Sequence, residues 1–183
     1  MKVKYTTKAK SVSNLWVYFK YYLGFFNKYN NIDWSKVSRI VFVCKGNICR
    51  SPYAEMRAKQ LGINALSIGL FTKAGSFANA DAIKNALYRD INLEAHRARI
   101  YQSTEFYDND LVICMEPWHV KLFKEVDNSG CQIALLGLLC SHKKIIISDP
   151  YGKPDLFFEE CFHAIDNALN NVKKCFKNIK IDA

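Results

Sequence analysis

The sequence has no apolar run long enough to cross a membrane. The longest candidate, Leu15–Phe26, has twelve residues and is interrupted by Lys20, whereas a helix needs about 20 apolar residues to span the hydrocarbon core. A secretory signal is also absent, because this run lacks a small-residue cleavage site and continues into Asn and Lys. We therefore expect a cytoplasmic protein whose contact with a membrane, if any, is peripheral.

Disulfide and metal patterns are lacking as well. The seven cysteines are an odd number and two of them, Cys44 and Cys49, fall in one short loop, which disfavours a disulfide-stapled extracellular fold. None of the four histidines has ligand spacing with the cysteines, so we expect no zinc site. We also expect no cofactor.

Acidic residues are almost absent from the first 38 positions. These positions hold seven Lys against one acid, Asp33, and account for six of the nine formal positive charges. A nucleic-acid enzyme would instead carry its basic residues on the folded domain. We therefore expect no nucleic-acid partner, and we assign the basic character to an N-terminal extension.

The length predicts one catalytic domain after that extension. A chain of 183 residues with 50% hydrophobic composition builds one well-buried core and not two. We assign residues 1–38 to a basic, aromatic helical extension and linker, and residues 39–183 to the domain. From Val12 to Phe26, apolar residues recur at three- and four-residue steps, the period of an amphipathic helix. Residues 27–38 read as the linker.

The aromatic face of the predicted helix, Ser11–Phe26, is expected to pack against another surface. Trp16, Phe19, Leu23 and Phe26 lie on one side of it, and a large apolar patch is unfavourable in water. We expect packing on the chain's own domain or dimerisation with a second copy. Docking to a membrane surface is the alternative, because lysines flank the aromatic face.

Short apolar runs alternate with helical patterns after the linker. The run Ile40–Val43 is rich in β-branched residues and precedes a glycine loop, which is typical of a buried parallel strand. The predicted strands are Arg39–Cys44, Ala65–Gly69, Asp110–Met115 and Ile133–Leu136, with Ile145–Ile147 strand-like. The predicted helices are Ser51–Leu61, Asp81–Asp90, Pro117–Val126 and Leu156–Phe176. This order predicts an α/β fold: a three-layer, doubly wound sheet of about four parallel strands with helices on both faces. A ligand would bind at the carboxyl ends of the strands.

A loop of the right size for a phosphate lies between Cys44, at a strand end, and Arg50, six positions later. If the loop wraps and leads into a helix, its amides converge on one anion that the helix dipole also favours. The same surroundings stabilise a thiolate, so we predict Cys44 as the nucleophile. Arg50 offers planar, bidentate donors to the phosphoryl oxygens. Gly46 permits close backbone approach and Asn47 tolerates left-handed geometry.

The segment Cys44–Pro52 resembles the signature loop of the low-molecular-weight protein tyrosine phosphatases. Later segments are similar to that family in order and spacing: Ser67-Ile68-Gly69, His96-Arg97-Ala98-Arg99, Asp110–Glu116 and Asp149-Pro150-Tyr151-Gly152. The resemblance covers about residue 39 to the C-terminal helix. It implies a flavodoxin-like phosphatase fold and hydrolysis of phosphotyrosine through a cysteinyl-phosphate. The phosphate-binding loop would include Lys45, Gly46, Asn47, Ile48, Cys49 and Ser51.

Further roles come from the same resemblance. Ser51 would hydrogen-bond the thiolate, while Asn47, Ser67 and His96 would form the network that holds the loop. Tyr151 resembles the aromatic wall of a deep substrate cleft, which would favour phosphotyrosine over the shorter phosphoserine. A partly exposed loop aromatic is the alternative for Tyr151. Bacterial-type relatives suggest a tyrosine kinase of polysaccharide synthesis as a partner.

Asp149 is the predicted general acid. It follows the apolar run Ile145–Ile147 in an Asp-Pro-Tyr-Gly loop that can lie over the strand ends. There it would protonate the leaving group and then act as base for the water that hydrolyses the phosphocysteine. An Asp-Pro pair alone is most often a turn, but the order of the motifs favours a catalytic role.

Three alternatives stay open from the residues alone. Cys49 is close enough in sequence to Cys44 to trap an oxidised nucleophile as a disulfide, or it is a small buried filler. A thiol arsenate reductase would relay oxidation to Cys131 and Cys140, although the Arg-Ser-Pro and Asp-Pro-Tyr segments look like a phosphatase. A phosphotyrosine-binding module without chemistry is disfavoured because Cys44, Arg50 and Asp149 are all present.

Overall fold

Four parallel strands form one sheet at the centre of the molecule. The computed structural model describes residues 7–181, apart from the side chains of residues 7–14, 103 and 177–181. The strands are β1 (Arg39–Cys44), β2 (Ala65–Gly69), β3 (Asp110–Cys114) and β4 (Gln132–Leu135), in the order β2-β1-β3-β4. Every pairing is parallel. The predicted fold class is thus confirmed, with β1 and β2 matching to the residue.

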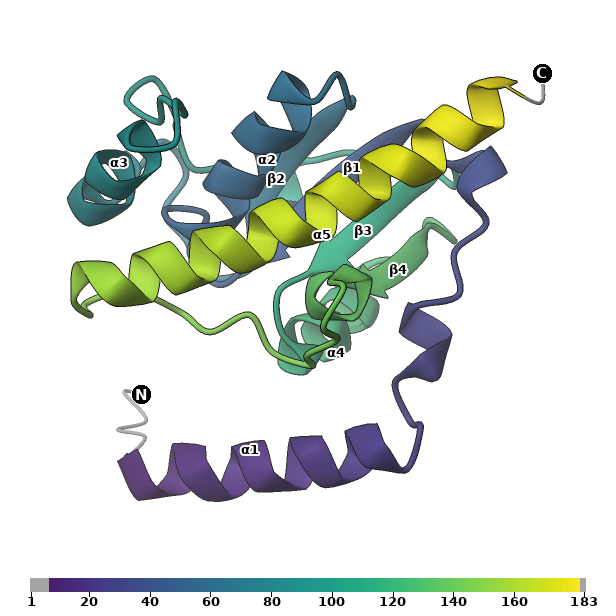
Figure 1. Ribbon diagram of the computed structural model, residues 1–183, viewed down its shortest axis with the longest axis horizontal. Helices are drawn as coiled ribbons and strands as arrows, with labels where there is room; N and C mark the ends of the chain where they lie inside the picture. The colour runs from purple at the N-terminus through teal and green to yellow at the C-terminus, as the bar shows by residue number, and fades with distance from the viewer. Residues whose placement is uncertain (1–6, 182–183) are drawn as a thin grey trace.

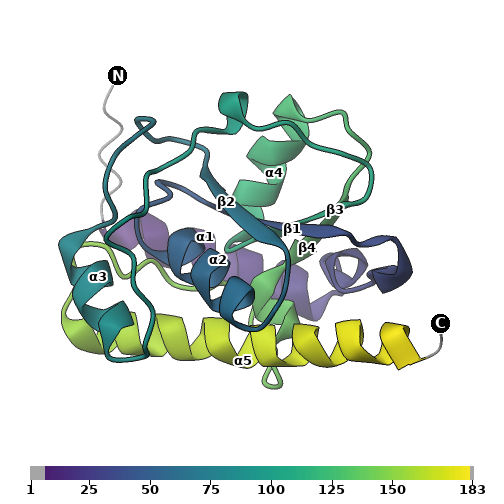
Figure 2. The same cartoon turned by 90° about the horizontal axis from the view of Figure 1, so that it is seen from above.

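Helices cover both faces of this sheet (Figures 1 and 2). One face carries α2, α3 and α5, and the other carries α4. Their bounds are α2 (Arg50–Gln60), α3 (Ala80–Leu87), α4 (Pro117–Val126) and α5 (Asp155–Ile181). The predicted Pro117–Val126 matches exactly the bounds of α4, whereas α5 extends beyond its predicted end. The three layers bring the carboxyl ends of the strands to one edge, where connecting loops meet.

Side chains along β1 point alternately to the two faces of the sheet, and each face has its own hydrophobic core. Ile40 and Phe42 pack with α2 and α5, whereas Val41 and Val43 pack on the α4 side. All four are fully buried, which explains the continuous apolar run, since both faces of a central parallel strand are covered. The core therefore anchors the strand that ends at Cys44.

The strand-like segment Ile145–Ile147 is not a strand in the described sheet, so that prediction is wrong. Ile147 donates one backbone hydrogen bond to the Met115 carbonyl at 2.9 Å, and the sheet gains no further ladder there. Ile145 is buried on the α4 side and Ile147 on the α5 side. The segment is apolar because it passes between the two cores.

The N-terminal helix α1 (Thr7–Tyr22) ends four residues before its predicted end at Phe26. Gly24 has φ +78°, a left-handed conformation that terminates a helix. Phe26 precedes a 3₁₀ turn at Asn27–Tyr29, and a second turn, Trp34–Lys36, lies within the predicted linker. The predicted contribution of the Val12 side chain lies outside the described residues.

Helix α1 lies along the outside of the domain (Figure 1). Val17 and Tyr21 pack against the core on the α4 side, and so do Phe26 and Tyr29 after the helix. The described part of the chain contains no helix that is long and apolar enough to cross a membrane.

Candidate active site

The loop from Cys44 to Arg50 joins the end of β1 to the start of α2. Asn47 adopts φ +50°, the left-handed geometry that lets the loop turn back on itself. Gly69, at the end of β2, lies directly beside the loop. A Cβ at Gly69 would sit 3.0 Å from both Asn47 N and Gly46 C, so this glycine permits the close approach.

The carbonyl oxygens of this loop are held outward by groups around it. The Cys44 carbonyl accepts from Leu70 N at 3.1 Å and the Lys45 carbonyl from Phe71 N at 2.8 Å. The other two bonds are Asn79 N to Ile48 O at 2.8 Å and His96 Nε2 to Asn47 O at 2.9 Å. With its carbonyls occupied on the outside, the loop can turn its N–H groups toward the centre, where an anion can bind.

The Cys44 sulfur lies among hydrogen-bond donors. Asn47 N donates to Cys44 Sγ at 3.2 Å, and Ser51 Oγ is 3.0 Å from the same atom. The Ser51 oxygen accepts from Asn47 Nδ2 at 2.9 Å, and its own proton can point to the sulfur at 3.0 Å or to the Ile68 carbonyl at 3.4 Å. Since α2 begins at Arg50, the helix dipole adds positive potential there. The sulfur thus lies among donors at the positive end of a helix.

A buried polar network extends from that serine into the domain. Asn47 Nδ2 also donates to Ser67 Oγ at 2.7 Å, and Ser67 donates to Glu55 Oε2 at 2.6 Å. Arg99 donates its backbone N–H to Asn47 Oδ1 at 2.8 Å, while its side chain donates to Glu55 at 2.8 Å. The structure thus brings together Asn47 and Ser67, as the resemblance implied, and adds Glu55 and Arg99.

Two ionisable groups of this network have displaced pKa values. Burial raises the pKa of Glu55, but hydrogen bonds from Lys59, Ser67 and Arg99 outweigh it and leave the pKa below its usual value. Burial lowers the pKa of His96, so its ring is neutral at neutral pH. Because a carbonyl can only accept, Nε2 of His96 carries the proton that it donates to Asn47.

The Arg50 guanidinium lies between two carboxylates. It donates to Glu116 Oε1 at 2.6 Å and to the Ile147 carbonyl at 2.8 Å, and its other terminal nitrogen is 3.0 Å from Asp149 Oδ2. Arg50 is 1% exposed, so both carboxylates offset the cost of burying its charge. The predicted pair Arg50 and Asp149 therefore meets, and Glu116 joins it.

His119 supports Glu116 from the first turn of α4. Glu116 N donates to His119 Nδ1 at 3.1 Å, so the ring proton is on Nε2, which lies 4.0 Å from Glu116 Oε1. His119 is fully buried, and Nε2 has no hydrogen-bond partner within the described part of the chain. Burial and the positive charges of Arg50 and Lys45 hold the pKa of His119 well below its usual value.

A cleft of about 200 Å³ opens above the loop. Its lining residues are Cys44, Lys45, Gly46, Ile48, Cys49, Arg50, Phe71, Asp149 and Tyr151. Phe71 and Tyr151 are 61% and 60% exposed, so they form the rim while Cys44 lies at the bottom. The backbone N–H of Tyr151 contacts Asp149 Oδ1 at 3.4 Å. This arrangement admits a flat ring that carries a phosphate.

The second loop cysteine, Cys49, lines the same cleft and is buried. Burial, together with the nearby negative charges of Asp149 and Cys44, raises the pKa of its thiol far above the usual value. Cys49 is therefore a protonated thiol beside the predicted nucleophile.

Sequence reasoning assigned no site role to Glu116, Phe71, Glu55, Arg99 and His119, all of which the structure places in or beside this site. Glu116 comes two residues after β3 and Phe71 two residues after β2, so both stand at the carboxyl ends of strands next to β1. Their position on neighbouring strands was the available signal. Glu55 gave no such signal, because an acid within a helix is ordinarily solvated.

The two cysteines required by the arsenate reductase alternative do not line the cleft above the loop. Cys131 directly precedes β4 and thus lies at the amino edge of a parallel sheet, opposite Cys44. Cys140 is buried and contacts the Ala164 carbonyl on α5 at 3.4 Å. No group of three or more potential metal ligands occurs among the residues that the structure describes.

Comparison with known proteins links this architecture to one family. The model for the low molecular weight phosphotyrosine protein phosphatases matches residues 39–182. The low molecular weight protein-tyrosine-phosphatase Wzb of Salmonella typhi is 30% identical over 134 residues, which is 72% of this chain and 89% of that protein. The match to the family model begins at the first residue of β1, so the extension lies outside it.

Solved structures agree on the fold. Vibrio vulnificus Wzb in complex with benzylphosphonate has a TM-score of 0.66 and 26% identity, covering 75% of this chain and 98% of that one. The YwlE arginine phosphatase from Geobacillus stearothermophilus has a TM-score of 0.69 at 22% identity, covering 79% and 96%. At that identity the second likeness concerns the fold alone.

The buried His119 predicts a loss of stability in mild acid. The unfolded chain protonates this histidine near pH 6.5, but the folded protein does so only at much lower pH. Between these values only the unfolded state binds the proton, so stability falls as pH drops, by about 1.4 kcal/mol per pH unit for one proton. His119→Gln removes this contribution. Urea unfolding at several pH values below 6.5 should then show a shallower slope than in the wild type.

The matched control for that measurement is His142→Gln. His142 is exposed, so its replacement should leave the slope unchanged. Equal slopes for His119→Gln and the wild type would contradict the assignment.

Proposed function

Because the chain belongs to the low-molecular-weight phosphotyrosine protein phosphatase family, we propose that it hydrolyses phosphotyrosine with Cys44 as nucleophile, Arg50 as phosphate clamp and Asp149 as general acid and base. The observation that carries this assignment is the geometry of the loop. Its sulfur sits among donors at the bottom of the cleft, and an arginine and a carboxylate meet above it.

In the first step, the Cys44 thiolate attacks phosphorus, and the bond to the phenolic oxygen breaks. The inward N–H groups and Arg50 stabilise the charge on the phosphoryl oxygens, which is largest in the transition state. Asp149, in its protonated form, donates its proton to the departing oxygen. The products are free tyrosine on the protein substrate and a cysteinyl-phosphate.

In the second step, Asp149 removes a proton from a water molecule that attacks the cysteinyl-phosphate. Inorganic phosphate forms and the Cys44 thiolate is restored, with the Ser51 hydroxyl able to stabilise the leaving sulfur. Glu116 holds Arg50 through Nη1, whereas Asp149 contacts Nη2. A dianionic ester can therefore replace Asp149 at the guanidinium while the Glu116 contact keeps Arg50 in place.

The aromatic rim supports an aryl phosphate as substrate. Phe71 and Tyr151 stand at the mouth, and Ile48 adds an apolar wall. A related protein binds benzylphosphonate, an aromatic phosphonate. A phosphoserine side chain is too short to bring its phosphate to the bottom while its backbone stays outside the rim. A tyrosine kinase of polysaccharide synthesis stays a prediction for the natural partner.

The first prediction concerns the nucleophile and the clamp. Cys44→Ser and Arg50→Lys should each lower kcat for aryl phosphates roughly a thousandfold or more, because both groups act on the transition state. Cys175→Ser, on α5 and distant in sequence from the loop, is the control and should retain wild-type turnover. Thermal denaturation verifies that each variant folds. Wild-type turnover in folded Cys44→Ser would refute the mechanism.

The second prediction concerns the acid. Asp149→Asn should lower kcat for phosphotyrosine by about 10²- to 10⁴-fold, and much less for a dinitrophenyl phosphate, whose leaving group needs no proton. Asp108→Asn, in an exposed loop, is the control. An equal loss on both esters would remove Asp149 from the acid step.

The third prediction concerns Cys49. Peroxide should oxidise the Cys44 thiolate to a sulfenic acid, and the Cys49 sulfur should then attack it, forming a disulfide and releasing water. A dithiol should restore activity in the wild type, but not in Cys49→Ser, each relative to its own starting activity. Mass spectrometry should detect the Cys44–Cys49 crosslink. Its absence after reversible inactivation would leave Cys49 as a packing residue.

A further inference from the structure

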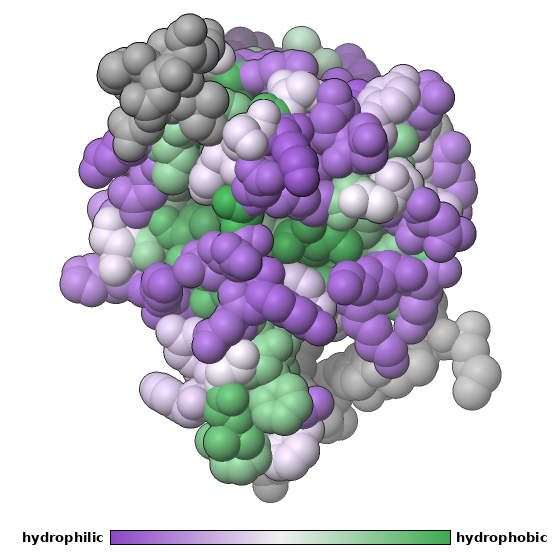
Figure 3. Space-filling view, turned by 90° about the vertical axis from the view of Figure 1, so that its right-hand side faces the viewer, coloured by the Kyte–Doolittle hydropathy of each residue, from purple (hydrophilic) through white to green (hydrophobic). Residues whose placement is uncertain are grey.

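The N-terminal extension presents an apolar surface that the other described residues leave exposed. We define this extension surface as the side chains of Leu15, Trp16, Phe19, Tyr22, Leu23 and Phe25, which are between 50% and 82% exposed. Trp16 and Phe19 stack on each other with ring centroids 5.3 Å apart. Figure 3 shows apolar residues gathered on the lobe that projects below the body of the protein.

The opposite side of α1 packs on the domain, so the extension surface faces away from it. Val17 and Tyr21 are partly buried against the core on the α4 side. The domain is therefore contacted by the other side of the helix. Among the residues that the structure describes, packing within the chain leaves the extension surface exposed, which favours a cover from outside the described part of the chain.

The charge within residues 1–32, which carry this surface, is of one sign. Residues 1–32 contain six lysines and no acidic residue. Lys20 lies over the Trp16 ring at 5.6 Å. From the domain, Lys124 lies over the Tyr29 ring at 5.4 Å, and Lys28 lies over the same ring at 5.3 Å. A second copy docked through this surface would bring two such lysine-rich segments together, which is electrostatically unfavourable.

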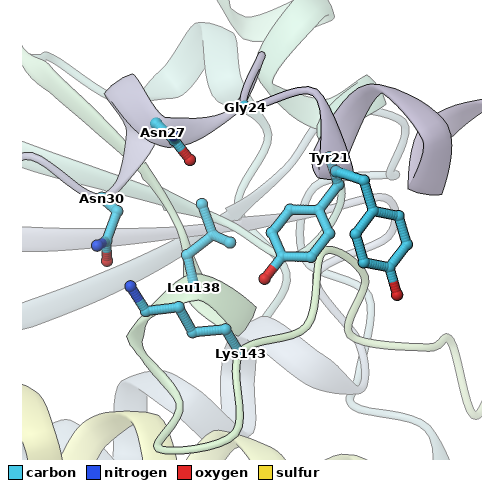
Figure 4. Close-up of a pocket in the computed structure, with 7 residues that line it drawn as sticks. Tyr21, Gly24, Asn27, Asn30, Leu138 and Lys143 are labelled. Carbon is cyan, nitrogen blue, oxygen red and sulfur yellow. The ribbon is translucent and has the colours of Figure 1, made fainter.

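A cleft of about 490 Å³ lies between the extension and the domain (Figure 4). It is lined by Tyr21, Tyr22, Gly24, Asn27, Asn30, Leu138 and Lys143, with no carboxylate among them. When the Asn30 amide is turned so that both of its ends have partners, its nitrogen lies 3.1 Å from the Leu138 carbonyl and its oxygen 3.1 Å from Lys143 Nζ. Lys143 has no ion pair among the described residues, so its charge is available to an anion.

We propose that the extension surface docks on an anionic phospholipid bilayer and that the cleft beside it holds a lipid headgroup phosphate near Lys143. Aromatic side chains are favourable at the boundary between headgroups and acyl chains, and lysines beside them are attracted to anionic lipid. Docking covers the exposed aromatic rings without entering the hydrocarbon core. The phosphatase cleft stays a separate site, since none of its lining residues belongs to the extension.

The test is co-sedimentation of the full chain with vesicles of phosphatidylcholine, with and without phosphatidylglycerol. The protein should bind the anionic vesicles, and added salt should weaken this binding. Trp16→Ala/Phe19→Ala should lower partitioning at least about tenfold. Lys20→Gln, Lys28→Gln and Lys143→Gln should each lower it about fivefold.

Two exposed residues distant from this surface supply the matched controls. Tyr88→Ala, just after α3, and Lys174→Gln, on α5, should leave vesicle binding unchanged. Turnover of a soluble aryl phosphate without vesicles should stay at the wild-type level in every extension variant, so this outcome is independent of the phosphatase mechanism.

Two results would overturn the proposal. One is equal binding, or no binding, to neutral and anionic vesicles. The other is a dimer in sedimentation velocity that Trp16→Ala/Phe19→Ala dissociates, without vesicle binding by the wild type, which would assign the surface to a second copy.

Discussion

The active site depends on the outward anchoring of the loop carbonyls. Backbone amides from two neighbouring segments and one histidine occupy the carbonyls of Cys44, Lys45, Asn47 and Ile48. A loop held in this way cannot turn its carbonyls toward the centre, where they would repel a phosphate. The backbone dipoles are therefore oriented when the chain folds, so no free energy has to be spent on orienting them when a substrate binds.

A second constraint is the buried positive charge of Arg50. A guanidinium this deeply buried needs carboxylate partners, and Glu116 and Asp149 supply them from different loops. The two partners differ in surroundings, because Glu116 is supported by buried His119 while Asp149 is 40% exposed. One partner can hold the arginine while the other is free for proton transfer.

The extension lies outside the residues that match the family model, and the docking role proposed for it is separate from the phosphatase chemistry. Its inner edge joins the core on the α4 side, whereas its outer aromatic rings and lysines face away from the sheet. Exposed aromatic side chains next to lysines are the features on which the proposal of an anionic lipid surface as partner rests. The domain would then work beside that surface, with its cleft formed entirely by residues after the linker.

The sequence by itself determined the features that depend on near neighbours. The β-branched run before Cys44 predicted β1 to the residue, and the spacing from Cys44 to Arg50 predicted the loop, because strand periodicity and turn chemistry are local. Only the tertiary structure decided that Glu116, 66 positions from Arg50, contacts it, since that contact requires β3 to lie beside β1. Likewise, Ile145–Ile147 resembled a strand but passes between two cores. An apolar segment can be expected to be buried. Which other segments it packs against depends on how distant parts of the chain are arranged around the sheet.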